Sequence, residues 1–193
     1  MRKVERSELL DLAAYEKVRD DFRNRIIERK RNRRVQLGPH MSLVFENHDT
    51  VLLQINEMLR TERITDERAI EHELSTYNEM IPEPNTLCGT LFIEYDDAAT
   101  RKDMLMRFAS LRQHVRLRLG DAESIARFSV HHGEELDRLP AVNYLTFALA
   151  PFAATQLADA SCRAALVVTH PDYEVALPLS PATRAELAAD LSS

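Results

Sequence analysis

The chain has 193 residues, of which 45% are apolar and 29% are charged, and its formal net charge is −6. This composition is typical of a single globular domain and excludes wholesale disorder. No apolar run approaches the ~20 residues that cross a bilayer, and the N-terminus is charged where a secretory signal is apolar. We therefore expect a cytoplasmic protein without a membrane segment.

Charge is distributed unevenly along the chain. Residues 1–34 contain twelve Lys and Arg against seven Asp and Glu, whereas the remainder is strongly acidic. Such asymmetry indicates an anionic partner, or a basic helix that packs on an acidic body.

The helix-rich part comes first, over residues 1–81. Ser7 is expected to cap a helix that runs to about residue 32, and strands are expected at 35–37 and 41–45 on either side of a Gly-Pro turn. Asp49 or Thr50 is expected to cap a second helix to about residue 63. Asp66 is expected to cap a third helix, which the prolines at 82 and 84 end.

The strand-rich part follows, over residues 87–193. It predicts strands and helices in the order strand 87–95, helix 98–111, strands 115–119, 125–130 and 142–149, a short helix at 151–160, strands 163–169 and 173–179, and a closing helix from Pro181. Hairpin-length connections favour antiparallel pairing. The sequence therefore predicts one α+β domain, with N-terminal helices followed by a mostly antiparallel sheet with flanking helices.

Cysteine and glycine usage excludes several chemistries. The two cysteines, Cys88 and Cys162, each lie in an apolar segment that we expect to be a strand, so they are predicted to be buried, reduced thiols. The four glycines are far apart, whereas phosphate-binding loops need clustered glycines. No cofactor is predicted.

Several short motifs resemble a bacterial family of unknown function, domain of unknown function 3501. They are Phe45-Glu46-Asn47 with Asp49-Thr50, Gln54-Ile55, Glu57-Met58-Leu59-Arg60, Glu73-Leu74, Tyr77-Asn78, Ile81-Pro82, Thr90-Leu91 with Ile93-Glu94, and His170-Pro171 with Tyr173. The sequence departs from the family pattern at His48. The resemblance implies no catalytic residues. Because family members tend to be encoded beside rubrerythrin-like and iron–sulfur oxidoreductase proteins, it implies a partner of that kind and a role near redox or oxidative-stress chemistry.

A metal site is one candidate. A di-iron carboxylate bundle uses Glu-x-x-His on its helices, and this chain has no such motif. The remaining candidate ligands are His72, His131, His132 and Glu134, for which solvated polar surface is the simpler interpretation.

A basic run that includes Arg29, Arg31, Arg33 and Arg34 is a second candidate, as a partner- or anion-binding site. Arginine binds phosphate through bidentate hydrogen bonds. Cations also stabilise a helix C-terminus, which explains part of the run without a ligand. The acidic net charge and the lack of interleaved aromatic residues argue against nucleic acid.

A polar set around the second helix is the third candidate. It comprises Glu46, Asp49, Gln54, Glu57 and Arg60, which could line a pocket for acid–base chemistry. Helix caps and ion pairs, such as Glu57 with Arg60, are the structural alternative.

Three hypotheses follow. The first is a non-catalytic accessory or interaction protein that works with a redox partner. The second is a metal-binding protein or metalloenzyme with His and Glu ligands. The third is binding of nucleic acid or another anion through the arginine-rich helix end. The sequence does not define the oligomeric state.

Overall fold

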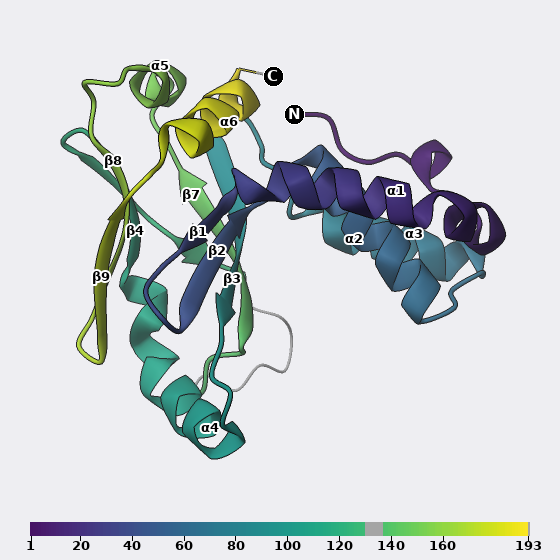
Figure 1. The fold of residues 1–193 in the computed structure, drawn as a ribbon, viewed down its shortest axis with the longest axis horizontal. Coiled ribbons are helices and arrows are strands. Elements are labelled where there is room, and N and C mark those ends of the chain that lie inside the picture. The colour runs from purple at the N-terminus through teal and green to yellow at the C-terminus, as the bar shows by residue number, and fades with distance from the viewer. Residues whose placement is uncertain (130–136, 193) are drawn as a thin grey trace.

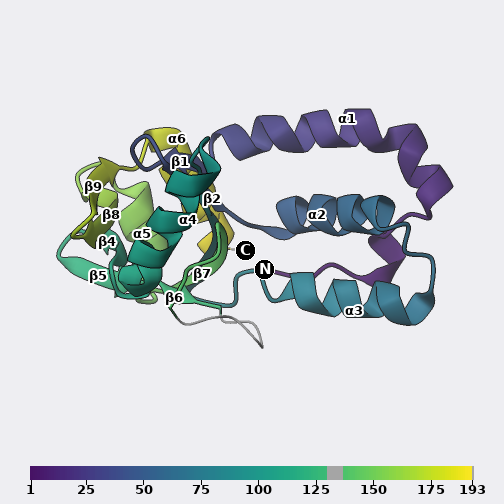
Figure 2. The same cartoon turned by 90° about the horizontal axis from the view of Figure 1, so that it is seen from below.

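A helical arm extends from a body built of two β-sheets (Figures 1 and 2). The structure is a computed structural model and describes residues 1–129 and 137–192. The arm contains the 3₁₀ helix η1 (Arg6–Glu8) and the helices α1 (Leu12–Arg31), α2 (His48–Thr61) and α3 (Glu67–Asn78). Figure 2 shows α1, α2 and α3 side by side, pointing away from the sheets.

The strands of the body form two sheets. Sheet A has the order β1-β2-β3-β7-β6, and sheet B has the order β5-β4-β8-β9. The bounds are β1 (Arg34–Gln36), β2 (Met41–Phe45), β3 (Thr86–Ile93), β4 (Val115–Leu119), β5 (Ala122–Ile125), β6 (Arg127–Phe128), β7 (Val142–Ala148), β8 (Ala164–His170) and β9 (Tyr173–Pro178). Every pairing between described strands is antiparallel.

The main core lies between the two sheets. Alternate residues of each strand point into it, including Leu43 and Leu91 from sheet A and Leu117 and Leu166 from sheet B. The flanking elements are α4 (Ala98–Arg107), the 3₁₀ helix η2 (Phe108–Gln113), α5 (Ala153–Ala158) and α6 (Pro181–Leu191).

The arm has an apolar cluster of its own. Val51, Ile55 and Leu59 of α2 pack there with apolar residues of α3 and with Val4 from the N-terminal segment. Asn78 fixes that segment, because its side chain accepts a hydrogen bond from the Val4 N–H (2.9 Å) and donates one to the Val4 carbonyl (3.0 Å). The N-terminal segment therefore forms part of the arm.

The α+β fold class is confirmed, with two antiparallel sheets in place of one. The strand predicted at 125–130 is wrong as a single element, since β5 belongs to sheet B and β6 to sheet A. Buried Ala126 lies at the crossing and donates its N–H to the Val115 carbonyl (2.9 Å). The helix predicted over 98–111 ends at Arg107 and continues as η2.

Two predicted helix caps and one cysteine assignment are also wrong. The side chain of Asp11, rather than Ser7, accepts the N-terminal hydrogen bond of α1, because the chain leaves helical conformation between η1 and α1. Asn47 caps α2 by accepting from the Thr50 N–H (3.1 Å). Cys162 precedes β8 and is partly exposed. No helix within the described residues has the length and apolar character to cross a membrane.

Candidate functional site

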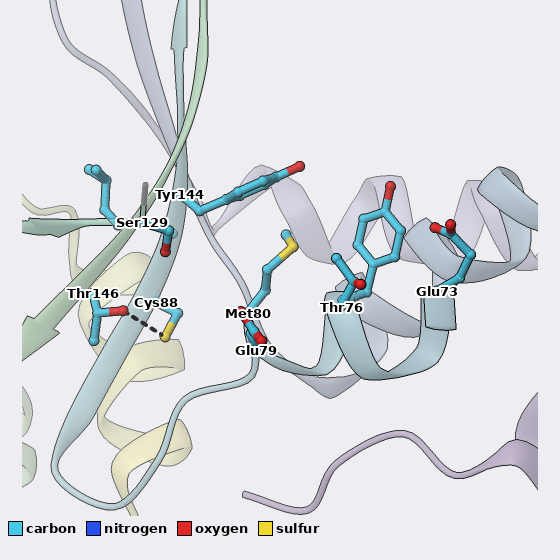
Figure 3. Close-up of a pocket in the computed structure, with 11 residues that line it drawn as sticks. Glu73, Thr76, Glu79, Met80, Cys88, Ser129, Tyr144 and Thr146 are labelled. Atoms are coloured by element: carbon cyan, nitrogen blue, oxygen red, sulfur yellow. Dashed lines mark hydrogen bonds between the residues drawn. The ribbon is translucent and has the colours of Figure 1, made fainter. Parts of the chain in front are cut away.

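A cavity of about 180 Å³ lies where the helical arm meets sheet A (Figure 3). One wall comes from α3 and the residues that follow it, including Tyr77 and Met80. The other wall comes from Cys88 on β3 and Tyr144 on β7. Figure 3 shows Tyr144 extending from the sheet towards the helices, so the cavity joins the two parts of the molecule.

Strand periodicity places the sheet residues of this site. Leu87 of β3 points into the core between the sheets, so Cys88 and Thr90 lie on the opposite face. In the register of β3 and β7, Cys88 is opposite Thr146 and Thr90 is opposite Tyr144. These four side chains therefore share the face that meets the arm.

The Cys88 thiol is held in its protonated form. It is 5% exposed, and its Sγ lies 3.7 Å from the Thr146 hydroxyl oxygen. Burial raises the pKa of Cys88, and the charges of Glu46 and Glu83 raise it further, although Thr146 and Arg127 oppose them. A thiol with a raised pKa is a poor nucleophile.

The two tyrosines of the cavity also remain neutral. Burial raises the pKa of Tyr144, and the Glu46 charge adds to that effect. Burial likewise raises the pKa of Tyr77, helped by Tyr144 and Glu73, whereas a hydrogen bond with Gln54 lowers it. The site therefore presents aromatic rings and neutral hydroxyl groups.

Glu46 places a buried carboxylate beside this cavity. It follows β2 directly, and its Oε1 accepts a hydrogen bond from the Thr90 hydroxyl (2.7 Å). Burying a carboxylate is costly without such hydrogen bonds. Glu46 lies close enough to Cys88 and Tyr144 for its charge to raise the pKa of both groups.

The polar set predicted around the second helix does not form one pocket. Only Glu46 and Gln54 lie next to the tyrosines of the cavity. The others have partners elsewhere: Asp49 pairs with Arg29 and His48, Glu57 accepts from Tyr15 (2.7 Å) and Arg19 (2.8 Å), and Arg60 pairs with Glu16 (2.7 Å). The expected pair between Glu57 and Arg60 is replaced by ion pairs with α1, because each side chain faces that helix.

The arginines predicted to bind a partner or anion all have contacts within the chain. Arg29 pairs with Asp49, and Arg31 pairs with Glu28 on its own helix (3.0 Å). Arg33 is buried against acidic residues of α6, and Arg34 donates to Ser42 (2.7 Å) and lies over the Phe92 ring. The structure therefore does not bring these four side chains together.

The predicted metal ligands are not assembled in the described part of the chain. His72 is exposed on α3, and His131, His132 and Glu134 lie outside the described residues. Over residues 1–129 and 137–192, no three His, Cys, Asp or Glu side chains come together in a way that could hold a metal ion.

A histidine–serine pair that the sequence did not indicate lies under the β8–β9 hairpin. His170 Nε2 is 3.0 Å from the Ser110 hydroxyl, and its Nδ1 accepts from the Asp172 N–H (3.1 Å). Burial lowers the pKa of His170, so the ring is neutral and Nε2 carries the proton. His170 therefore donates to Ser110 and cannot act as a base towards it in this arrangement. The hydrogen bond from the Asp172 N–H to His170 stabilises the turn between β8 and β9.

A shallow groove of about 350 Å³ lies along α1. Leu10, Val18, Phe22 and Leu52 supply most of its apolar lining. Val18 is 44% exposed, and only Tyr15 and Ile26 are fully buried along the 20 residues of α1. This helix thus leaves much of its surface uncovered.

Sequence reasoning missed the cavity because its walls come from segments that are distant in the chain. Tyr77 falls in the predicted third helix and Tyr144 in the strand predicted at 142–149, and no local pattern brings the two together. The one available signal was a run of polar residues, at 143, 144 and 146, that interrupts β7.

Comparisons with known proteins place the chain in a family. The solved structure of a novel protein of unknown function from Burkholderia pseudomallei K96243 is 34% identical, and the match covers 98% of this chain and 100% of that one with a TM-score of 0.90. No curated protein matches the chain. The family described as "Protein of unknown function (DUF3501)" matches residues 3–191. The chain therefore belongs to the DUF3501 family.

Proposed function

We propose that the protein is a non-catalytic accessory protein that binds an acidic partner protein through the outer face of its helical arm. The observation that carries this proposal is the exposure of α1, which has two fully buried side chains in 20 residues. Most helices in proteins are stabilised by packing of an apolar face. Exposed apolar residues that line a groove, as on α1, are typical of an interaction surface.

Charge supports an acidic partner. Arg23, Arg25 and Lys30 of α1 have no acidic partner among the described residues, and Arg25 lies over the Phe22 ring. Of these three, Arg25 lines the groove, whose charged lining also includes Glu8 and Asp21. These basic side chains on α1 complement an acidic surface on a partner. Nucleic acid is disfavoured by the net charge of −6 and by the lack of interleaved aromatic residues in the basic run, whose four arginines predicted to bind an anion have partners within the chain.

The absence of catalysis is proposed on the state of the nucleophiles. The Cys88 thiol has a raised pKa, and His170 donates to Ser110 instead of accepting from it. Neither arrangement activates a nucleophile. The partner implied by the family resemblance is a rubrerythrin-like or iron–sulfur protein.

Titration calorimetry with the purified rubrerythrin-like and iron–sulfur proteins tests the proposal. We expect a complex that Val18→Glu and Arg25→Glu each weaken at least tenfold. Val142→Glu is the matched control, because Val142 is 43% exposed on β7, against 44% for Val18. If neither protein binds at tens of micromolar, or if Val18→Glu and Val142→Glu have equal effects, the proposal is wrong.

A further inference from the structure

The cavity between α3 and sheet A has the composition of a ligand-binding site separate from the proposed partner surface. Its described lining includes the rings of Tyr77 and Tyr144, the thioether of Met80, and the carboxylates of Glu73 and Glu79. No Lys, Arg or His is among the described residues that line it. The cavity thus combines aromatic surface with negative charge.

The negative charge acts inside the cavity as well as at its rim. Glu46 does not line the cavity; it is buried and accepts a hydrogen bond from Thr90, the residue opposite Tyr144 in the sheet. The pKa values of Cys88 and Tyr144, which do line it, are raised first by burial and then by the Glu46 charge. Glu73 has the same effect on Tyr77. Arg127, which opposes this field at Cys88, does not line the cavity.

The two tyrosines approach from different elements. Figure 3 shows Tyr144 projecting from the sheet, with Met80 and Glu73 on the helix side of the space in front of it. Tyr77 is on α3, close enough to Tyr144 for that phenol to raise its pKa. A ligand between the arm and the sheet would therefore meet two aromatic side chains, one from each part of the molecule.

We propose that this cavity binds a small organic cation, with an alkylated ammonium group between Tyr77 and Tyr144 and its charge balanced by Glu73 and Glu46. Aromatic faces attract cations through the ring quadrupole, and alkylated ammonium groups are bound by aromatic cages. A buried cation requires a counter-charge, which the two carboxylates supply. A cavity of about 180 Å³ suits a small molecule rather than a drug-sized one.

The first test compares choline with its uncharged analogue 3,3-dimethylbutanol, which has the same shape. The chain contains no Trp and five Tyr, so tyrosine fluorescence can follow binding directly, and calorimetry gives the affinity. We expect choline to bind with a dissociation constant in the millimolar range or tighter, and at least tenfold more tightly than the analogue. The proposal is refuted if the two compounds bind equally. It is also refuted if choline does not bind at about 10 mM, a concentration roughly tenfold above the ~1 mM dissociation constant of a weak specific complex.

The second test uses matched variants. Glu73→Gln should weaken choline binding several-fold, whereas Glu71→Gln, an exposed position on the same helix, should leave it unchanged. Tyr144→Phe keeps the ring and should retain binding, while Tyr144→Leu should lose at least about tenfold in affinity. Equal affinities for the Glu73 and Glu71 variants would contradict the assigned counter-charge, even if Tyr144→Leu fails to fold. Variants that lose choline binding should still bind the partner protein through α1. This result distinguishes failure of this inference from failure of the proposed function.

Discussion

Arg33 and Asp190 form a buried, bidentate ion pair that joins the end of α1 to the C-terminal helix α6. The Arg33 Nη1 lies 2.6 Å and Nη2 lies 2.8 Å from the two Asp190 carboxylate oxygens. Glu186 accepts a further hydrogen bond from Nη2 at 3.0 Å. The pair connects the base of the arm with helix α6, so the packing of the arm and the packing of α6 should be lost together on unfolding.

Removing this guanidinium is expected to destabilise the protein strongly. Arg33→Met removes the guanidinium that neutralises the buried Asp190 carboxylate, and breaking a buried ion pair in this way costs about 3–5 kcal/mol. Urea unfolding followed by circular dichroism measures the change. Arg31→Met is the control, since Arg31 is exposed and its ion pair is with Glu28 on the same helix. Similar losses for the two variants would show that the pair with Asp190 is unimportant.

The carboxylate of Glu8, in the N-terminal segment, should make the stability of the protein depend on pH. The Arg2 guanidinium lowers the pKa of Glu8 from 4.5 to about 2, and His48 also lowers it. A group whose pKa is lower in the folded protein stabilises it above its unfolded pKa, and this stabilisation disappears as pH falls through the folded value. Glu8→Gln should therefore lower the free energy of unfolding above about pH 4.5, and this effect should shrink as pH falls towards 2 and vanish below it.

The size of that effect is limited by solvent. The side chains of Arg2 and Glu8 are 61% and 20% exposed, so we expect about 1 kcal/mol at neutral pH. Chemical unfolding of both proteins at several pH values gives the comparison. A difference that grows towards low pH would contradict the assignment.

A substitution at Arg63, which follows the end of α2, is expected to stabilise the protein. Arg63 has a φ of 53° and follows the helix, where the Ile64 N–H bonds to the Leu59 carbonyl (2.9 Å) and the Arg63 N–H bonds to the Arg60 carbonyl (3.3 Å). This Schellman arrangement favours glycine, which adopts a positive φ without steric cost. Arg63→Gly should raise stability by about 0.5–1 kcal/mol, and thermal unfolding checks it. Arg60→Gly, inside the helix, should do the opposite.

The two cysteines should differ in reactivity. Cys162 is partly exposed, whereas Cys88 is buried and burial raises its pKa. A thiol reagent such as dithionitrobenzoate should therefore label one site per native molecule quickly, and both sites after denaturation. Cys162→Ser should remove the fast phase. Fast labelling that persists in that variant would mean that Cys88 is reactive, and would count against a non-catalytic site.

Local signals predicted those parts of the fold that depend on neighbouring residues. Asp66 caps α3, β4 spans Val115–Leu119, and Pro181 is at the start of α6, all as periodicity and capping rules indicate. Arg33 belongs to the basic run that predicts an anion-binding site, because nothing near it in the chain shows that Asp190 would neutralise it. The cavity was missed for the same reason, since Tyr77 and Tyr144 come together only when the arm packs against sheet A.

The β1–β2 turn and the β8–β9 hairpin are held together by a single tyrosine. The Tyr173 hydroxyl donates to the Leu37 carbonyl and accepts from the His40 N–H (3.2 Å). Gly38 lies between them with a φ of 73°, and a Cβ there would be 2.6 Å from the Tyr173 hydroxyl oxygen. Gly38 therefore meets two constraints, a positive φ and the nearby hydroxyl group.

A double-mutant cycle separates these constraints. Gly38→Ala should cost about 2 kcal/mol from backbone strain and the clash, and Tyr173→Phe should cost about 1 kcal/mol from lost hydrogen bonds. Because Tyr173→Phe removes the atom that the new Cβ meets, the double variant should lose less than the sum of the two, by at least about 0.5 kcal/mol. Unfolding in urea measures all four proteins. Strict additivity would mean that only the positive φ, and not the hydroxyl of Tyr173, requires glycine at this turn.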